Sequence, residues 1–152
     1  MQASVGEFLK PRVVKVTPTT AKQAKVVIEP FERGFGTTVG NGLRRVLLSS
    51  LEGAAVTSVK IKGADHEFTS IPGVREDVTD IILNIKDVVL TSVSEESVNL
   101  RLDVRGPAAV TAGDIECPAD VEILNKDLPI ATLNGKARLA IDLTVEQGRG
   151  YA

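Results

Sequence analysis

The stretch ERGFGTTVGNGLRRVLLSSLEG, residues 32–53, joins a glycine-rich turn to an apolar repeat of helical period. Five apolar residues fall on one helical face at this spacing: Val39, Leu43, Val46, Leu47 and Leu51. We therefore expect an amphipathic helix over residues 37–51. Thr37 or Thr38 is expected to cap its start, and Gly53 has the position of a C-terminal glycine.

Gly40 and Gly42 lie inside this expected helix. Each glycine in a helix interior costs about 1 kcal/mol relative to alanine. Because glycine lets a second backbone come close, the two positions indicate tight packing on that part of the helix.

The balance of charge changes directly after the helix. Residues 1–51 carry 8 Lys and Arg against 3 Asp and Glu, a net charge of +5. Residues 52–152 carry 10 against 17, a net charge of −7. The split suggests two parts that face different partners.

The amino-terminal part also contains a predicted hairpin. Residues 12–17 and 23–29 are rich in β-branched side chains and flank a turn with Pro and Thr. Beyond Gly53, residues 54–62 and 66–71 suggest a second hairpin, after which Pro72 and Gly73 open a helix of residues 75–86.

The rest of the chain has the pattern of strands. Residues 98–104 and 137–145 alternate apolar with polar side chains, and shorter candidate strands lie between them. We predict an α+β fold of two subdomains, a basic hairpin-plus-helix piece followed by a mainly antiparallel β piece with one helix.

Composition excludes several classes of protein. Hydrophobic residues make up 43% and charged residues 25% of the chain, as in globular proteins. No stretch approaches the roughly 18 to 20 apolar residues that span a bilayer, and the first ten residues do not resemble a secretory signal. His66 and Cys117, the single His and the single Cys, make a weak case for zinc or a Cys-His nucleophile. These features predict a cytoplasmic protein that does not associate with a membrane.

The glycine-rich turn does not fit a nucleotide-binding motif. From Gly34 the order G-F-G-T-T-V-G is one residue longer than G-x-G-x-x-G, and no Lys-Ser or Lys-Thr pair follows as in a P-loop. We therefore expect Gly34 and Gly36 to serve turning and packing rather than phosphate binding.

Arg44 and Arg45 allow two interpretations. Neighbouring helical residues point about 100° apart, so at most one of the two arginines faces a given partner squarely. A nucleic-acid-binding helix usually adds further basic or stacking aromatic residues, which are missing here. The pair is either a solvated basic edge or a protein-docking site, since Arg is enriched at interface hot spots.

The remaining polar residues give little sign of chemistry. Glu76, Asp77 and Asp80 could form a metal or acid–base cluster, but helix capping and a solvated face are favoured because no His joins them. His66 is expected to be packed or hydrogen-bonded. The sequence predicts no catalytic residue, no metal site and no cofactor.

Three strings carry a resemblance to a known family: EPFERGFGTTVGNGLRRVLLSSLEGAAVTSVKIKG (29–63), HEFTSIPGVREDVTDIILNIK (66–86) and GRGY (148–151). Together with the opening MQASVGEFLKPR, they resemble the amino-terminal domain of the α subunit of bacterial-type DNA-directed RNA polymerase. The likeness covers essentially all 152 residues. It implies a non-catalytic scaffold in which two α subunits pair and then dock the β and β′ subunits.

The resemblance also implies roles for particular residues. Contacts with β are implied for one set on the helix of residues 37–51: Gly40, Asn41, Arg44, Arg45 and Leu48. Contacts with the second α subunit are implied for Phe35, Val39 and Val46. Asp80 and Lys86 lie in a region associated with large-subunit docking. Direct contact with nucleic acid is not expected from this part of the family.

The family fold has a dimerisation subdomain that is interrupted by a β-rich insert near residue 52. It implies that residues 1–51 begin the dimerisation subdomain and that residues 52–152 form the insert. Family members then return to the dimerisation subdomain with further strands and a second long helix, which these 152 residues do not include. We therefore expect the apolar stripe of the first helix to be incompletely covered, which bears on dimerisation of this chain.

Three functions follow, in order of preference. The first is an assembly subunit of RNA polymerase, in a bacterium or a plastid. The alternative is a stand-alone nucleic-acid-binding module that uses the basic residues 1–51, and it predicts binding that weakens steeply with salt. The third, an enzyme using the glycine-rich turn, predicts nucleotide binding.

Overall fold

The computed structural model describes residues 9–150, which form two compact units that divide between Ser50 and Leu51. The opening residues 1–8 and Tyr151, which carry part of the family resemblance, lie outside the described residues. Within residues 9–150, none of the helices combines the length and the apolar character needed to cross a bilayer.

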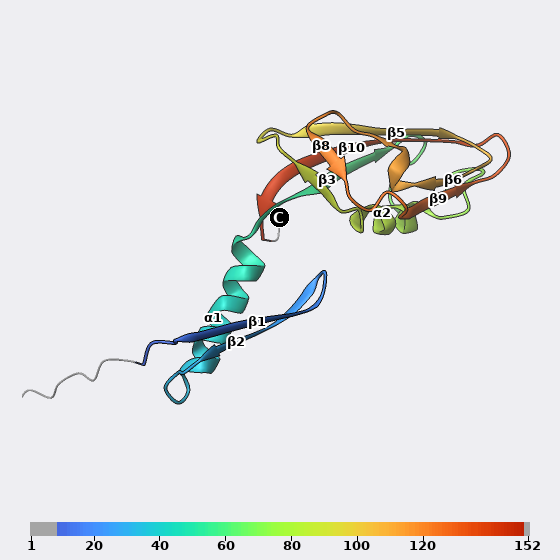
Figure 1. Ribbon diagram of the computed structural model, residues 1–152. Coiled ribbons are helices and arrows are strands. Elements are labelled where there is room, and N and C mark those ends of the chain that lie inside the picture. Colours follow the sequence, from blue (N-terminus) through green and yellow to red (C-terminus); the bar gives the residue numbers. More distant parts are fainter. Residues whose placement is uncertain (1–8, 151–152) are drawn as a thin grey trace, which may run out of the picture. The chain divides into compact units, whose positions relative to one another are not determined.

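The first unit consists of a hairpin and one helix (Figure 1). Strands β1 (Val13–Thr20) and β2 (Gln23–Glu29) pair antiparallel, with a register shift between Pro18 and Thr20. Helix α1 spans Phe35–Ser50. The predicted hairpin-plus-helix piece is confirmed.

Both ends of α1 differ from the prediction. The helix begins at Phe35, so Thr37 and Thr38 lie in its first turn rather than at an N-cap. At the other end, Gly53 belongs to the following strand, where it pairs with Gly148, and it does not cap the helix.

The second unit is built on a four-stranded antiparallel sheet with the order β3-β10-β5-β7. These strands are β3 (Glu52–Ile61), β10 (Arg138–Arg149), β5 (Val98–Arg105) and β7 (Ile115–Glu116). Figure 1 shows β3, β10 and β5 side by side, with β10 curving along its length. The predicted strands of residues 54–62, 98–104 and 137–145 are thereby confirmed.

Two smaller sheets and a helix complete this unit. Strand β4 (Leu90–Ser92) pairs with β8 (Val121–Ile123), and β6 (Ala108–Thr111) pairs with β9 (Pro129–Leu133). A 3-10 turn, η1, spans Ala112–Asp114. Helix α2 (Val78–Lys86) packs against β9 and β3.

The hydrophobic core lies within the second unit. The alternating side chains of the two long strands are buried as predicted: Leu100, Leu102, Leu139, Ile141, Leu143 and Val145. Helix α2 adds Val78, Ile81 and Ile85 to the same cluster. This shared burial holds α2 against β9 and β3.

The predicted second hairpin is wrong. Residues 66–71 contribute only an isolated bridge from Ser70 to Asp77, and β3 pairs instead with β10, far along the chain. The β3–β10 ladder sets Ile61 opposite Ile141, and both side chains are buried, whereas residues 66–71 form no strand. His66 is consequently exposed, and its predicted packing is also wrong.

Helix α2 begins later than predicted. Val74 forms a bridge with Leu133, and Glu76 bonds to Thr132, so this segment runs along β9 before it turns into the helix. Asp77 is the N-cap residue with an extended backbone, and only Asp80 of the predicted acids lies in the first turn.

Candidate protein-binding surface

A left-handed turn starts helix α1. Gly34 has φ +88°, a conformation that side chains with a Cβ rarely adopt. The N–H of Phe35 donates to the carbonyl oxygen of Glu32 at 3.0 Å, and the Thr38 hydroxyl donates to the carbonyl oxygen of Gly34 at 3.5 Å. Gly34 thus serves turning, as predicted, whereas Gly36 lies inside the helix.

The site residues named for α1 divide between two helical faces. At about 100° per residue, Phe35, Val39 and Val46 fall within roughly 40° of one another. The second set lies on the roughly opposite side of the helix: Gly40, Asn41, Arg44, Arg45 and Leu48. The helix therefore offers two separate surfaces.

Both surfaces of α1 are open. Val46 is 57% exposed and Leu48 is 66% exposed, although both are large apolar residues. The helix has no buried residue, and the same is true of the whole described part of the first unit, residues 9–50. The apolar stripe is therefore incompletely covered, as expected from the sequence.

Gly40 and Gly42 have no close neighbour among the described residues. A Cβ added at either position would meet no atom within 4 Å. The close packing that these glycines indicate does not occur within the described chain, so the space beside them is open to another molecule.

The arginine pair on α1 is exposed. Neither Arg44 nor Arg45 forms a salt bridge with any residue in the range 9–150. The carbonyl oxygen of Arg45 accepts a hydrogen bond from the Ser49 hydroxyl at 2.7 Å, which is a local contact of the backbone. The two guanidinium groups are thus free to meet a partner or solvent.

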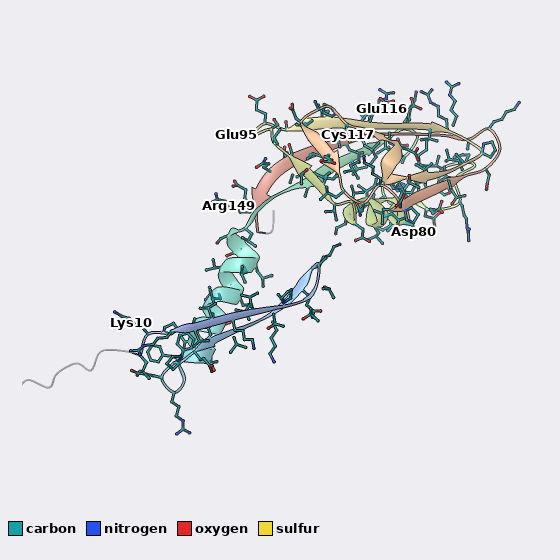
Figure 2. All side chains as sticks on the ribbon, in the orientation of Figure 1. Lys10, Asp80, Glu95, Glu116, Cys117 and Arg149 are labelled. Atoms are coloured by element: carbon teal, nitrogen blue, oxygen red, sulfur yellow. The ribbon has the colours of Figure 1, made fainter. Side chains whose placement is uncertain are left out.

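Helix α2 carries a second exposed row. Asp80 and Lys86 are both exposed, and Figure 2 shows Asp80 at the surface of the second unit. Between them around the helix lies Leu83, which is 54% exposed. The three side chains form what we call the α2 row: Asp80, Leu83 and Lys86.

Sequence reasoning missed Leu83, although a signal was present. The helical spacing that accounts for Val78, Ile81 and Ile85 leaves Leu83 on the opposite side of the helix. An apolar residue outside the buried stripe of an amphipathic helix marks an exposed apolar spot. Helix α1 belongs to the first unit and the α2 row to the second.

The acidic residues near α2 have distinct structural roles. Glu76 accepts hydrogen bonds from Thr132, and Asp77 occupies the N-cap position. Among residues 9–150, no three His, Cys, Asp or Glu side chains are grouped as metal ligands would be. The predicted solvated face holds for Asp77 and Asp80, but the Asp77 side chain makes no capping hydrogen bond, and Glu76 makes a longer-range contact.

The outer face of the main sheet holds an ion-pair network. Arg138 bonds Asp103 with both Nε, at 2.8 Å, and Nη2, at 2.5 Å, and Arg101 lies 3.6 Å from the same carboxylate. The hydrogen bonds from Arg138 hold the pKa of Asp103 at about 2, against a partial opposing effect of burial. The network ties β5 to β10 at their surface.

Comparisons with known proteins agree with this description. Residues 59–152 match the family described as the RNA polymerase Rpb3/RpoA insert domain. A protein named DNA-directed RNA polymerase subunit alpha from Corynebacterium efficiens is 64% identical over 131 residues, which cover 86% of this chain and 39% of the relative. Proteins of the same name from Beutenbergia cavernae and Kineococcus radiotolerans are each 60% identical over 129 residues, covering 85% of this chain and 38% of each relative.

The chain thus spans about two fifths of the length of these curated relatives. The matched family covers most of the second unit, and the relatives extend the likeness over most of the chain. On these grounds the chain belongs to the α-subunit family of bacterial-type DNA-directed RNA polymerase.

Proposed function

We propose that this chain is a non-catalytic assembly scaffold of DNA-directed RNA polymerase, which pairs with a second α subunit and docks the β and β′ subunits in the cytoplasm. The observation that carries the proposal is the exposure of both faces of α1: apolar side chains such as Val46 on one, and the arginine pair with Leu48 on the other.

The energetics of the first unit support a role that depends on partners. A two-stranded hairpin is marginally stable alone, and a helix of about 16 residues gains most of its stability from packing. Covering one exposed Val or Leu stabilises by about 1.5 to 3 kcal/mol when burial is complete. A unit with several such residues and no buried side chain among residues 9–50 gains much from a second chain.

The opposed faces of α1 suit two partners at once. In the proposal, Phe35, Val39 and Val46 meet the second α subunit through apolar contact. The other face meets β through Arg45 and Leu48, with Arg44 and Asn41 beside them. Gly40 lies on this second face, where the lack of a side chain lets the backbone of β approach.

The α2 row extends the proposal to the second unit. Asp80 and Lys86 flank the exposed Leu83, an arrangement of one apolar anchor between opposite charges. Interfaces commonly combine an apolar centre with a polar rim. We assign this row to docking of one of the two large subunits.

The basic charge of residues 1–51 supports one alternative, a nucleic-acid-binding module. Phosphate contacts release counterions, so such binding weakens steeply with rising salt. Docking through an apolar and arginine surface depends much less on salt. Titration of duplex DNA and of β at several salt concentrations therefore separates the two functions.

Two substitutions test the scaffold function, one on each of the two faces of α1. Arg45→Ala should weaken binding of purified β by about tenfold or more while self-association persists, because an exposed interface Arg is lost without loss of core volume. Val46→Asp should reduce self-association, measured by sedimentation, because it places a charge in an apolar seam. Lys22→Ala, which removes an exposed charge from the same unit, is the control for Arg45.

Unchanged capture of β by Arg45→Ala would remove the proposed docking role of this face. A sedimentation profile that Val46→Asp leaves unaltered would remove the proposed pairing face. Equal weakening of β binding by Arg45→Ala and Lys22→Ala would favour a general charge effect over a defined contact.

A further inference from the structure

We propose that Glu76 and Asn84 are positioning residues, which fasten α2 to β9 and so hold the α2 row in its docking geometry. The inference rests on the proposed function, in which the α2 row docks a large subunit. Neither residue belongs to the exposed row, and both act through the placement of the helix.

Strand β9 has one edge occupied by another strand and one edge turned to α2. Within the ladder with β6, Thr132 stands opposite Ala109, with Ala131 and Leu133 on either side of it. In an antiparallel strand, backbone groups point alternately to the two edges. The backbone N–H and carbonyl oxygen of Thr132 and the carbonyl oxygen of Ile130 point to the α2 side, where they bond to residues 76, 75 and 84.

Glu76 fastens the start of α2 to this edge. The backbone N–H of Thr132 donates to Oε2 of Glu76 at 2.6 Å, and the Thr132 hydroxyl donates to Oε1 at 2.9 Å. The N–H of Arg75 returns a hydrogen bond to the Thr132 carbonyl oxygen at 3.0 Å. The carboxylate thus takes the place that a carbonyl oxygen of a neighbouring strand would fill.

Asn84 fastens the other end of the helix. Its side-chain Nδ2 donates to the carbonyl oxygen of Ile130 at 2.9 Å. Glu76 precedes the first residue of α2, and Asn84 lies in the last turn. The two contacts are therefore about two helical turns apart, a separation that fixes both the tilt and the rotation of α2 on β9.

The contact at Glu76 is charge-assisted. Partial burial raises the pKa of the carboxyl, but the hydrogen bonds from the Thr132 backbone and hydroxyl outweigh this effect, so the net pKa is lowered. The carboxylate is ionised at neutral pH, and hydrogen bonds to an ionised acceptor are stronger than those between neutral groups.

Apolar packing alone would not set the same geometry. Val78, Ile81 and Ile85 bury one side of α2 in the core, and this burial is favourable in any orientation that keeps the three side chains away from water. Hydrogen bonds depend on direction as well as distance. Loss of the Glu76 contact should therefore change the placement of Leu83 and its neighbours more than it changes the burial of α2.

Glu76→Gln is the most direct test. Glutamine keeps one oxygen to accept from the Thr132 backbone N–H, and its amide can donate to the Thr132 hydroxyl, so the substitution removes the negative charge and leaves two neutral hydrogen bonds. Purified β and β′ are titrated separately with this chain and its variants. Leu83→Asp identifies the large subunit that binds the α2 row, and Glu122→Gln controls for the loss of one carboxylate from an exposed position.

We expect Glu76→Gln to weaken binding of the subunit identified by Leu83→Asp about tenfold, because two hydrogen bonds to an ionised carboxylate become weaker bonds between neutral groups. Binding of the other large subunit by Glu76→Gln should stay within about twofold of the unsubstituted chain, and so should binding of either large subunit by Glu122→Gln. Amide exchange at Thr132 should accelerate in Glu76→Gln, which reports the weakened contact directly and independently of docking.

The two possible failures are distinguishable. If Leu83→Asp leaves binding of both subunits unchanged, docking by the α2 row is wrong, and the positioning role falls with it. If Leu83→Asp weakens docking and Glu76→Gln does not, although exchange at Thr132 has accelerated, the positioning role alone is overturned.

A second variant keeps the test decisive if Glu76→Gln does not fold. Thr132→Val removes the hydroxyl donor and leaves the backbone N–H bond to Glu76 in place. It should weaken docking of the same subunit by a smaller factor, about threefold. Binding equal to that of the unsubstituted chain would overturn the positioning role.

Discussion

The two units of this chain use the same kinds of residue in opposite ways. In the second unit, the apolar residues of β5, β10 and α2 form a shared core. In the first unit, an equally regular apolar stripe on α1 remains exposed, and none of residues 9–50 is buried. Periodicity therefore identifies an amphipathic element, but it does not say whether the covering comes from the same chain or another one.

Glycines show the same contrast. Gly73 in the second unit has φ +80°, and a Cβ there would lie 2.6 Å from the Cβ of Ala137. Gly40 in α1 has a helical backbone, and nothing lies within 4 Å of the position that a Cβ would take. The first glycine is required by its own chain, whereas the second costs helix stability without an internal gain. The position of Gly40 therefore has no packing explanation within the described chain.

Truncation of a leucine in each unit tests the contrast with the largest expected effect. Leu102→Ala should lower the free energy of unfolding by about 2 to 5 kcal/mol, because the side chain is fully buried in β5. Leu47→Ala in α1 should change it by about 0.5 kcal/mol or less, because Leu47 is 56% exposed. Urea unfolding followed by far-UV circular dichroism measures both, at a protein concentration that keeps the chain monomeric.

Equal destabilisation by the two substitutions would break the comparison. It would mean that the α1 stripe contributes to an internal core after all. The matched chemistry of the pair, leucine to alanine in both cases, leaves burial as the difference between them.

The sequence was sufficient for elements whose pattern repeats several times. The alternation in residues 98–104 and 137–145 identified β5 and β10, and the apolar repeat after Gly34 identified α1. Both depend on local periodicity, which survives in any fold that buries one face. The α+β class and the two-part organisation follow from these elements.

Long-range pairing was not predictable in the same way. The partner of β3 is β10 rather than residues 66–71, because register and face matching between distant strands decide it. The late start of α2 has a similar cause, since Glu76 is held by Thr132, 56 residues away. Leu83, by contrast, could have been recognised from the helical spacing that leaves it outside the apolar stripe of α2.

Substitution of Gly40 sharpens the comparison at a smaller scale. Gly40→Ala should stabilise α1 by about 0.8 to 1 kcal/mol, because the helix gains an alanine and no atom obstructs the added methyl group. Slower amide exchange in α1 measures this gain. The same variant should bind β more weakly, because the methyl group occupies the space proposed for the backbone of the partner.

Gly36→Ala is the matched control for Gly40. Gly36 also lies in α1 with no atom within 4 Å of an added Cβ, but it is outside the proposed contact set. It should stabilise the helix without a loss of β binding. Equal β binding by both variants would contradict a close approach at Gly40.

The smallest expected effect concerns the surface of the second unit and depends on pH. Because the pKa of Asp103 is lowered from 3.8 to about 2 by Arg138, the ion pair contributes stability above pH 4 and loses that contribution as pH falls toward 2. Asp103→Asn should therefore lower the melting temperature near neutral pH, and its difference from the unsubstituted chain should shrink between pH 4 and pH 2.

Asp127→Asn, which alters an exposed carboxylate without a hydrogen bond or salt bridge in the described part of the chain, should show no such convergence. A difference for Asp103→Asn that stays constant down to pH 2 would mean that the network does not stabilise the sheet through the ionised carboxylate. The Arg138–Asp103 ion pair thus joins two strands of its own unit although it lies at the surface. Arg44 and Arg45 on α1, in contrast, have no ion-pair partner among residues 9–50.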